Sequence, residues 1–113
     1  LLCSYSEESI KNLYSQGMDK FTENTITNVE DLIQIMDKVK KEGIAEEIGE
    51  VTSDACCIAV PIKVNNQIIA AIGISMPIFR AKKEKIEKIK KLLCEHSNSI
   101  SKELENLNIK SLT

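Results

Sequence analysis

Apolar side chains recur at helical spacing in three parts of the chain, which predicts three helices. The first follows the capping-box sequence Ser4-Tyr5-Ser6-Glu7 and is expected to end at Gly17. The second is predicted at about residues 29–42, where acidic residues open the helix, lysines close it and Gly43 follows. The third covers residues 81–107, in which isoleucine and leucine return about every third or fourth position.

Between the second and third helices the apolar pattern changes to that of strands. Residues 56–64 and 68–76 are continuously apolar and β-branched, and residues 65–67 between them are expected to form a three-residue hairpin loop. Neither run has a polar face, so both are expected to be central strands, covered on both sides or bordered by a cavity. Residues 44–51 can hold a shorter strand. Pro61 lacks an amide donor and requires an outward-facing position or a bulge.

The order helix, helix, strand, strand, strand, helix predicts an α+β fold, with an antiparallel sheet, a central hairpin and flanking helices. A length of 113 residues fits one domain. The chain is 42% apolar and 28% charged, which is typical of folded proteins and argues against disorder. No apolar run is long enough to span a bilayer, so no membrane partner is expected. Only 4% of residues are aromatic, which argues against a stacking platform for single-stranded nucleic acid.

Charge is distributed unevenly along the chain. The net charge is −2, but residues 1–55 carry −7 and residues 56–113 carry +5. A uniformly basic nucleic-acid surface is therefore not indicated. The lysine-rich run at residues 80–91 is interleaved with glutamates, which favours a solvated helix face over contact with a DNA backbone.

The four cysteines, Cys3, Cys56, Cys57 and Cys94, contain no C-x-x-C spacing. A structural zinc site is therefore poorly supported, and no metal or other cofactor is expected. Neighbouring Cys56 and Cys57 would point to opposite faces of a strand, where a bond between them would be strained. The simplest interpretation is a set of reduced thiols in a cytoplasmic protein.

Alternation along the hairpin suggests where a ligand could bind. With a three-residue loop, Val64 lies opposite Ile68 and Cys57 lies opposite Ser75, whereas a two-residue loop would put Cys57 and Ser75 on opposite faces. One face then carries only short side chains, which could form the floor of a small-molecule pocket. These residues are Cys57, Ala59, Ala71, Gly73 and Ser75. The alternative is a helix packed closely against them. The bulky residues of the second strand, Ile68, Ala70, Ile72, Ile74 and Met76, are expected to pack under the third helix.

Three blocks of the chain resemble one known family. They are residues 43–50 (GIAEEIGE), 57–62 (CIAVPI) and 70–77 (AAIGISMP). Together they are similar to the C-terminal effector-binding domain of IclR-type transcriptional regulators. Residues 1–2 resemble the end of the family's Gly-Lys-Ala-Leu-Leu motif, and residues 21–27 (FTENTIT) resemble its threonine-rich connection.

The resemblance implies a GAF-like domain, at residues 1–113, that binds a small organic acid or similar metabolite. In such regulators the ligand changes how a homodimer or tetramer engages DNA through an N-terminal winged-helix domain, which is absent from this chain. The family's polar ligand contacts correspond to Glu47, Cys57 and Ser75. The resemblance implies no enzymatic activity. It also implies that the chain lacks the strands and pocket loop that normally precede Leu1, and hence part of the pocket.

This sequence departs from the family pattern at several positions. Its acidic cluster is Glu46-Glu47-Ile48-Gly49-Glu50, so the acidic contact is a longer side chain. Asp54 replaces the usual glycine before the cysteine strand, Gly73 replaces a serine, and Met76 replaces the glycine after Ser75. Two other functions remain open. One is a thiol-dependent GAF-like reductase that uses Cys57, although the single histidine that could activate the thiol, His96, is expected on a distant helix. The other is a structural dimerisation module without a ligand.

Overall fold

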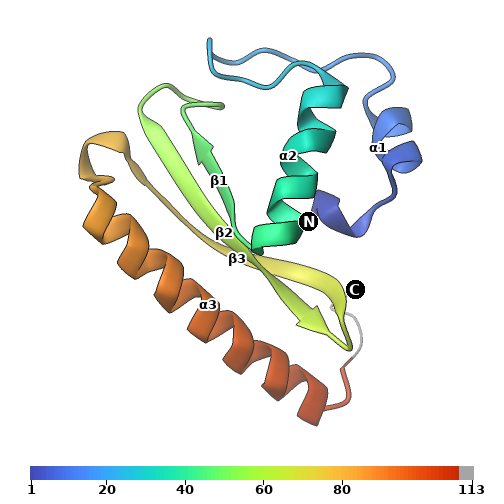
Figure 1. The fold of residues 1–113 in the computed structure, drawn as a ribbon, viewed down its shortest axis with the longest axis vertical. Helices are drawn as coiled ribbons and strands as arrows, with labels where there is room; N and C mark the ends of the chain where they lie inside the picture. The colour runs from blue at the N-terminus through green and yellow to red at the C-terminus, as the bar shows by residue number, and fades with distance from the viewer. Residues whose placement is uncertain (110–113) are drawn as a thin grey trace.

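The computed structural model describes residues 1–109 and contains an antiparallel sheet with helices on both sides (Figure 1). The strand order is β1-β2-β3, and helices α2 and α3 lie on opposite sides of the sheet (Figure 1). The elements in chain order are η1 (Leu2–Ser4), α1 (Glu7–Leu13), α2 (Val29–Glu42), β1 (Ala45–Ile48), β2 (Ala55–Val64), β3 (Gln67–Pro77), η2 (Ile78–Arg80) and α3 (Lys83–Asn106). This arrangement confirms the predicted α+β fold class.

Helix α2 has the predicted boundaries because both of its ends carry strong local signals. The Asn28 side chain accepts hydrogen bonds from the backbone amides of Glu30 and Asp31, two of the donors that the first turn leaves without helical partners. At the other end Gly43 adopts the left-handed conformation, with φ of 72°, and its amide bonds to the carbonyl of Val39. These caps place the C-terminus of α2 directly before β1.

Helix α1 is shorter than predicted. The Ser6 hydroxyl caps it by accepting from the amide of Ser9, as the capping box indicates. The helix ends at Leu13, however, and Gly17 lies in the turn that follows, with φ of 96° and its amide bonded to Tyr14. The prediction that Gly17 directly terminates α1 was wrong, because the chain already turns at Tyr14.

The predicted three-residue loop of the β2–β3 hairpin was also wrong. Asn65 and Asn66 both have positive φ, 52° and 66°, and form a two-residue turn that pairs Val64 with Gln67. A β-bulge then occurs beside Ile62 and Lys63, and it shifts the register by one residue. The bulge offsets the shorter turn. Cys57 therefore lies opposite Ser75, as predicted, and Ile68 is moved to the face that carries Ala71 rather than the face under α3.

The hydrophobic core lies between α3 and one face of the hairpin. Leu93 of α3 packs with Cys56, Ile58, Val60 and Met76, all of them buried. Ile72 packs against this cluster, as expected for the bulky face of β3, whereas Ile74 is 40% exposed. Strand β2 is central as predicted. Strand β3 forms an edge of the sheet built by residues 1–109, which corrects the expectation that both strands are central.

Candidate functional site

The face of the sheet turned away from α3 carries all six residues that the sequence marked as a ligand site. Two rows cross the three strands. Glu47 of β1 pairs with Cys57 of β2, which pairs with Ser75 of β3. In the next row, Ala59 pairs with Ala45 on one side and with Gly73 on the other. Because residues paired across antiparallel strands share a face, Glu47, Cys57 and Ser75 form a row of polar residues on this face.

A cavity of about 180 Å³ lies over one end of this face. Its floor includes Ala59 and Ala71, and its walls come from η1 and from the C-terminal end of α2. The lining residues are Leu1, Cys3, Val39, Lys40, Gly43, Ala45, Ala59, Val60, Pro61, Lys63, Ile68 and Ala71. The polar row Glu47–Cys57–Ser75 lies on the same face outside this cavity. Of the predicted site residues, Ala59 and Ala71 therefore line the cavity, and the polar row lies beside it.

The face is open rather than covered by a tightly fitted helix. Ala71, Gly73 and Ser75 are exposed, and Cys57 and Ala59 are partly buried. Gly73 meets a local steric limit, because a Cβ atom at this position would lie 2.9 Å from the carbonyl oxygen of Ile58. The short side chains therefore leave this face open to solvent. At Gly73 the absence of a side chain also allows the backbones of β2 and β3 to lie close together.

The carboxylate of Glu47 is held by the backbone of the loop after β1. Its Oε1 atom accepts hydrogen bonds from the amides of Glu50, at 2.6 Å, and Val51, at 3.2 Å. Burial and the negative charge of Glu47 together raise the pKa of Glu50 above its ordinary value. Glu47 is therefore both a member of the polar row and the residue that fixes the geometry of loop 49–51.

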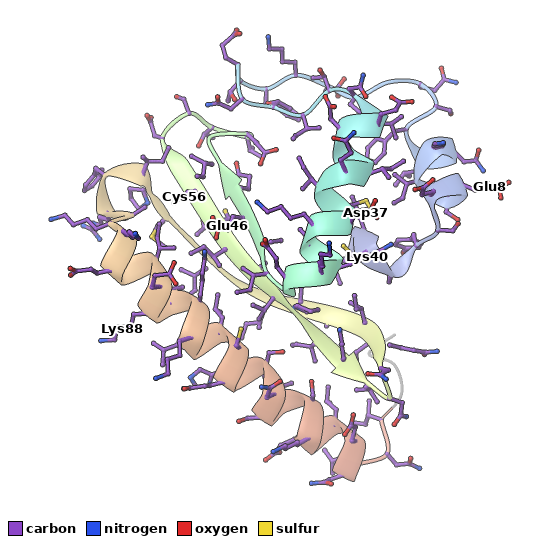
Figure 2. All side chains as sticks on the ribbon, viewed as in Figure 1. Glu8, Asp37, Lys40, Glu46, Cys56 and Lys88 are labelled. Atoms are coloured by element: carbon purple, nitrogen blue, oxygen red, sulfur yellow. The ribbon has the colours of Figure 1, made fainter. Side chains whose placement is uncertain are left out.

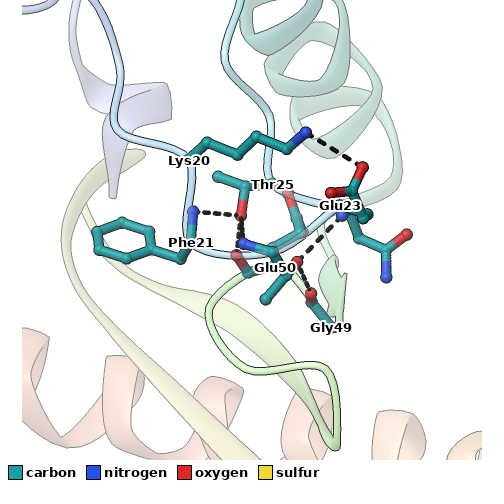
Figure 3. A network of polar contacts seen from close by, with 8 residues as sticks. Lys20, Phe21, Glu23, Thr25, Gly49 and Glu50 are labelled. Carbon is teal, nitrogen blue, oxygen red and sulfur yellow. Dashed lines mark hydrogen bonds and ion pairs between the residues drawn. The ribbon is translucent and has the colours of Figure 1, made fainter.

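Loop 49–51 is clasped in turn by the connection between α1 and α2 (Figure 3). The Thr22 hydroxyl donates to the carbonyl of Gly49, and the Thr25 hydroxyl donates to the carbonyl of Glu50. Gly49 is buried with φ of 65°, and a Cβ atom there would lie 2.9 Å from the Asn24 side chain. Sequence reasoning missed this clasp. The available signals were the threonine-rich segment and the glycine that ends β1.

The opposite side of the sheet carries a different set of contacts. Lys90 of α3 forms ion pairs with Glu46 of β1 and, at 3.7 Å, with Glu87. The side-chain hydrogen bond with Glu46 raises the pKa of Lys90, and the charges of Glu46 and Glu87 add to this effect. Lys88 points away from the sheet (Figure 2), and it is exposed, as are most basic residues at the start of α3. These features match the solvated helix face that the charge pattern favours.

Residues 1–109 contain no cluster of three or more His, Cys, Asp or Glu side chains placed to hold a metal ion. Within the same residues, no helix is long and apolar enough to cross a membrane.

The sequence of the chain matches the family described as the bacterial transcriptional regulator IclR C-terminal domain, over residues 1–102. The chain belongs to this family. It is 32% identical over 107 residues to the HTH-type transcriptional regulator KdgR of Escherichia coli strain K12, and the match covers 92% of this chain and 40% of KdgR. The IclR-type chain therefore spans less than half the length of this transcriptional regulator.

Solved structures agree with the IclR assignment. The C-terminal domain of E. coli KdgR superposes with a TM-score of 0.82 and 27% identity, covering 92% of this chain and 65% of that domain. An IclR homologue from Microbacterium hydrocarbonoxydans, solved in complex with 4-hydroxybenzoate, superposes with a TM-score of 0.82 and 24% identity. That match covers 94% of this chain and 42% of the homologue, and it shows a shared fold.

Proposed function

We propose that this chain is the effector-sensing part of an IclR-type transcriptional regulator and that its ligand is a small organic acid or similar metabolite. The ligand would lie on the face of the sheet opposite α3. Its contacts would be Glu47, Cys57, Ala59, Ala71, Gly73 and Ser75. In the full-length cytoplasmic protein, ligand binding would alter how a homodimer or tetramer engages DNA through a separate N-terminal domain.

The observation that carries the proposal is the row Glu47–Cys57–Ser75 on an open face beside a cavity floored by Ala59 and Ala71. Short apolar side chains provide contact area, and the neighbouring hydroxyl and thiol provide polar partners. A ligand that buries such a polar group without giving it a hydrogen-bond partner loses about 1–3 kcal/mol, which is a source of specificity. The relative with bound 4-hydroxybenzoate supports an organic acid as the ligand class.

Regulation requires that the ligand favour one arrangement of the oligomer over another. The cavity is built from three separate parts of the chain: η1, the end of α2 and the sheet. A molecule that fills it would therefore contact all three and stabilise one relative placement of them. This is the physical route by which binding would reach the rest of the regulator.

Thiol-dependent reduction by Cys57 is less well supported. A reactive thiol needs a nearby base, cation or helix N-terminus. The single histidine, His96, lies on α3, which packs against the other face of the sheet from Cys57. The polar neighbours of Cys57 across the sheet are a glutamate and a serine, and neither is a base, cation or helix N-terminus of the kind that activates a thiol.

The proposal is tested by titrating the full-length regulator with a panel of small organic acids that includes 4-hydroxybenzoate, using calorimetry. We expect at least one acid to bind, and Ser75→Ala to weaken that binding by roughly tenfold. Ser99→Ala is the matched control, because Ser99 is an exposed serine on α3. A well-folded protein that binds no member of the panel, or equal losses in both variants, would overturn the proposal.

A further inference from the structure

The threonine-rich connection before α2 contacts the candidate ligand site through an intermediate loop. Thr22 and Thr25 donate hydrogen bonds to the carbonyls of Gly49 and Glu50, and the same loop supplies the two amides that hold the Glu47 carboxylate. We infer that Thr22 and Thr25 are positioning residues for Glu47. The inference rests on the proposed function, because it assigns both threonines to the site in which Glu47 would contact the ligand.

Each threonine hydroxyl acts both as a donor and as an acceptor, so the contact with loop 49–51 depends on these side chains. The Thr25 oxygen also accepts hydrogen bonds from the amides of Phe21 and Thr22, at 3.1 and 2.9 Å. The Thr22 oxygen accepts from the amide of Asn24 at 3.0 Å. Each hydroxyl therefore accepts hydrogen bonds from amides of its own segment and donates its proton to a carbonyl of loop 49–51 (Figure 3). A hydroxyl can do both because it is a donor and an acceptor at once.

Gly49 allows the threonine-rich connection to contact loop 49–51 closely. Its left-handed backbone turns the chain directly after β1, and its missing side chain leaves room for Asn24. Loop 49–51 is thus fixed from two sides, by the threonines through its carbonyls and by Glu47 through its amides. A peptide unit whose carbonyl is held has a restricted amide direction, because the peptide group is planar. The carbonyl of Gly49 and the amide of Glu50 belong to one such unit, as do the carbonyl of Glu50 and the amide of Val51.

Each threonine hydroxyl is therefore connected to the Glu47 carboxylate through one peptide group and two hydrogen bonds. The Thr22 hydroxyl fixes the peptide whose amide binds Glu47, and the Thr25 hydroxyl fixes the next peptide, whose amide also binds Glu47. The same connection leads to Asn28, the N-cap of α2. A ligand that drew the Glu47 carboxylate away from these amides would therefore loosen the segment that precedes α2.

The inference is tested by measuring amide hydrogen exchange of Glu50 and Val51 by NMR in the full chain. Thr22→Val and Thr25→Val keep the side-chain shape and remove the hydroxyl. We expect each to accelerate exchange of these two amides by roughly fivefold to tenfold. Thr27→Val is the matched control, since Thr27 is an exposed threonine of the same connection, and it is expected to leave both rates unchanged.

A positioning role is separated from a general loss of stability by a double-mutant cycle. In Glu47→Ala the two amides have already lost their acceptor, so adding Thr25→Val is expected to accelerate their exchange by less than twofold. Fully multiplicative effects of the two substitutions, or unchanged rates in the threonine variants, would overturn the inference. The proposed function fails separately: the exchange results can hold while no organic acid binds.

Discussion

The hydroxyl of Ser97 on α3 donates a hydrogen bond of 2.5 Å to the carbonyl oxygen of Pro61 on β2. This contact lies where β2 extends beyond the start of β1, because the first residue of β1, Ala45, pairs with Ala59. Farther along, the Ser101 hydroxyl accepts from the amide of Lys63 and the Glu105 carboxylate accepts from that of Asn65. Side chains spaced four residues apart on α3 thus bond to backbone groups of the hairpin that β1 does not reach. Pro61 lies in this part of β2, so its lack of an amide proton interrupts no pairing with β1.

Removing the first of these contacts tests the replacement. Ser97→Ala leaves the Pro61 carbonyl without its partner in a site where Ser97 is only 6% exposed. We expect the free energy of unfolding to fall by about 1–2 kcal/mol in urea denaturation. Ser99→Ala, on the exposed side of the same helix, is expected to change stability by less than about 0.5 kcal/mol. Equal effects of the two substitutions would show that the contact adds nothing.

Gly73→Ala tests the close approach of the two hairpin strands. The new Cβ would lie 2.9 Å from the carbonyl oxygen of Ile58 and 3.2 Å from the Cβ of Ala59, so the strands must separate slightly. We expect a loss of about 1–3 kcal/mol in stability. Ser75→Ala, at an exposed position two residues farther along β3, is the control and is expected to be nearly neutral. A Gly73→Ala protein as stable as wild type would contradict the described register.

Glu50→Gln tests the electrostatics of loop 49–51. The pKa of Glu50 is raised, so ionisation at neutral pH disfavours the folded state relative to the unfolded state. The stability associated with the protonated form is complete below the ordinary pKa of 4.5 and is lost as pH rises through the folded-state value. We therefore expect Glu50→Gln to raise the melting temperature at pH 7, and this gain to disappear at acidic pH. Exposed Glu103→Gln should show neither effect.

Filling the cavity tests its role in binding. Ala71 is exposed and lines the cavity, so Ala71→Leu places a larger side chain in the volume that a ligand would occupy. We expect binding of any organic acid identified in the calorimetric panel to weaken by roughly tenfold or more, with little change in stability. Gln67→Leu makes a similar change at an exposed residue of the same strand outside the cavity. Unchanged affinity in Ala71→Leu would place the ligand elsewhere.

Local signals were sufficient to predict α2, because Asn28 and Gly43 determine its ends through contacts within a few residues. The hairpin loop was predicted incorrectly, because a two-residue turn with a bulge and a three-residue loop without one give the same pairing of Cys57 with Ser75. Alternation cannot distinguish the two. It does assign Ile68 to the wrong face, since the bulge lies between this residue and the rest of β3.

The candidate site was predictable where it depends on strand alternation and not where it depends on distant segments. The shared face of Cys57, Gly73 and Ser75 follows from pairing within one hairpin. The walls of the cavity come from η1 and α2, whose placement depends on tertiary packing. The loop that binds the Glu47 carboxylate is likewise held by Thr22 and Thr25, which lie more than twenty residues earlier in the chain. Spacing along the chain carries no information about that contact.

The most direct test of the central claim is a crystal structure of the full-length regulator grown with an organic acid that binds in the calorimetric panel. The account predicts that the acid contacts Ala59, Ala71 and Gly73, with a polar group within hydrogen-bonding distance of the Ser75 hydroxyl. An acid bound on the α3 side of the sheet, or a Ser75 covered by packed protein with the acid elsewhere, would contradict it.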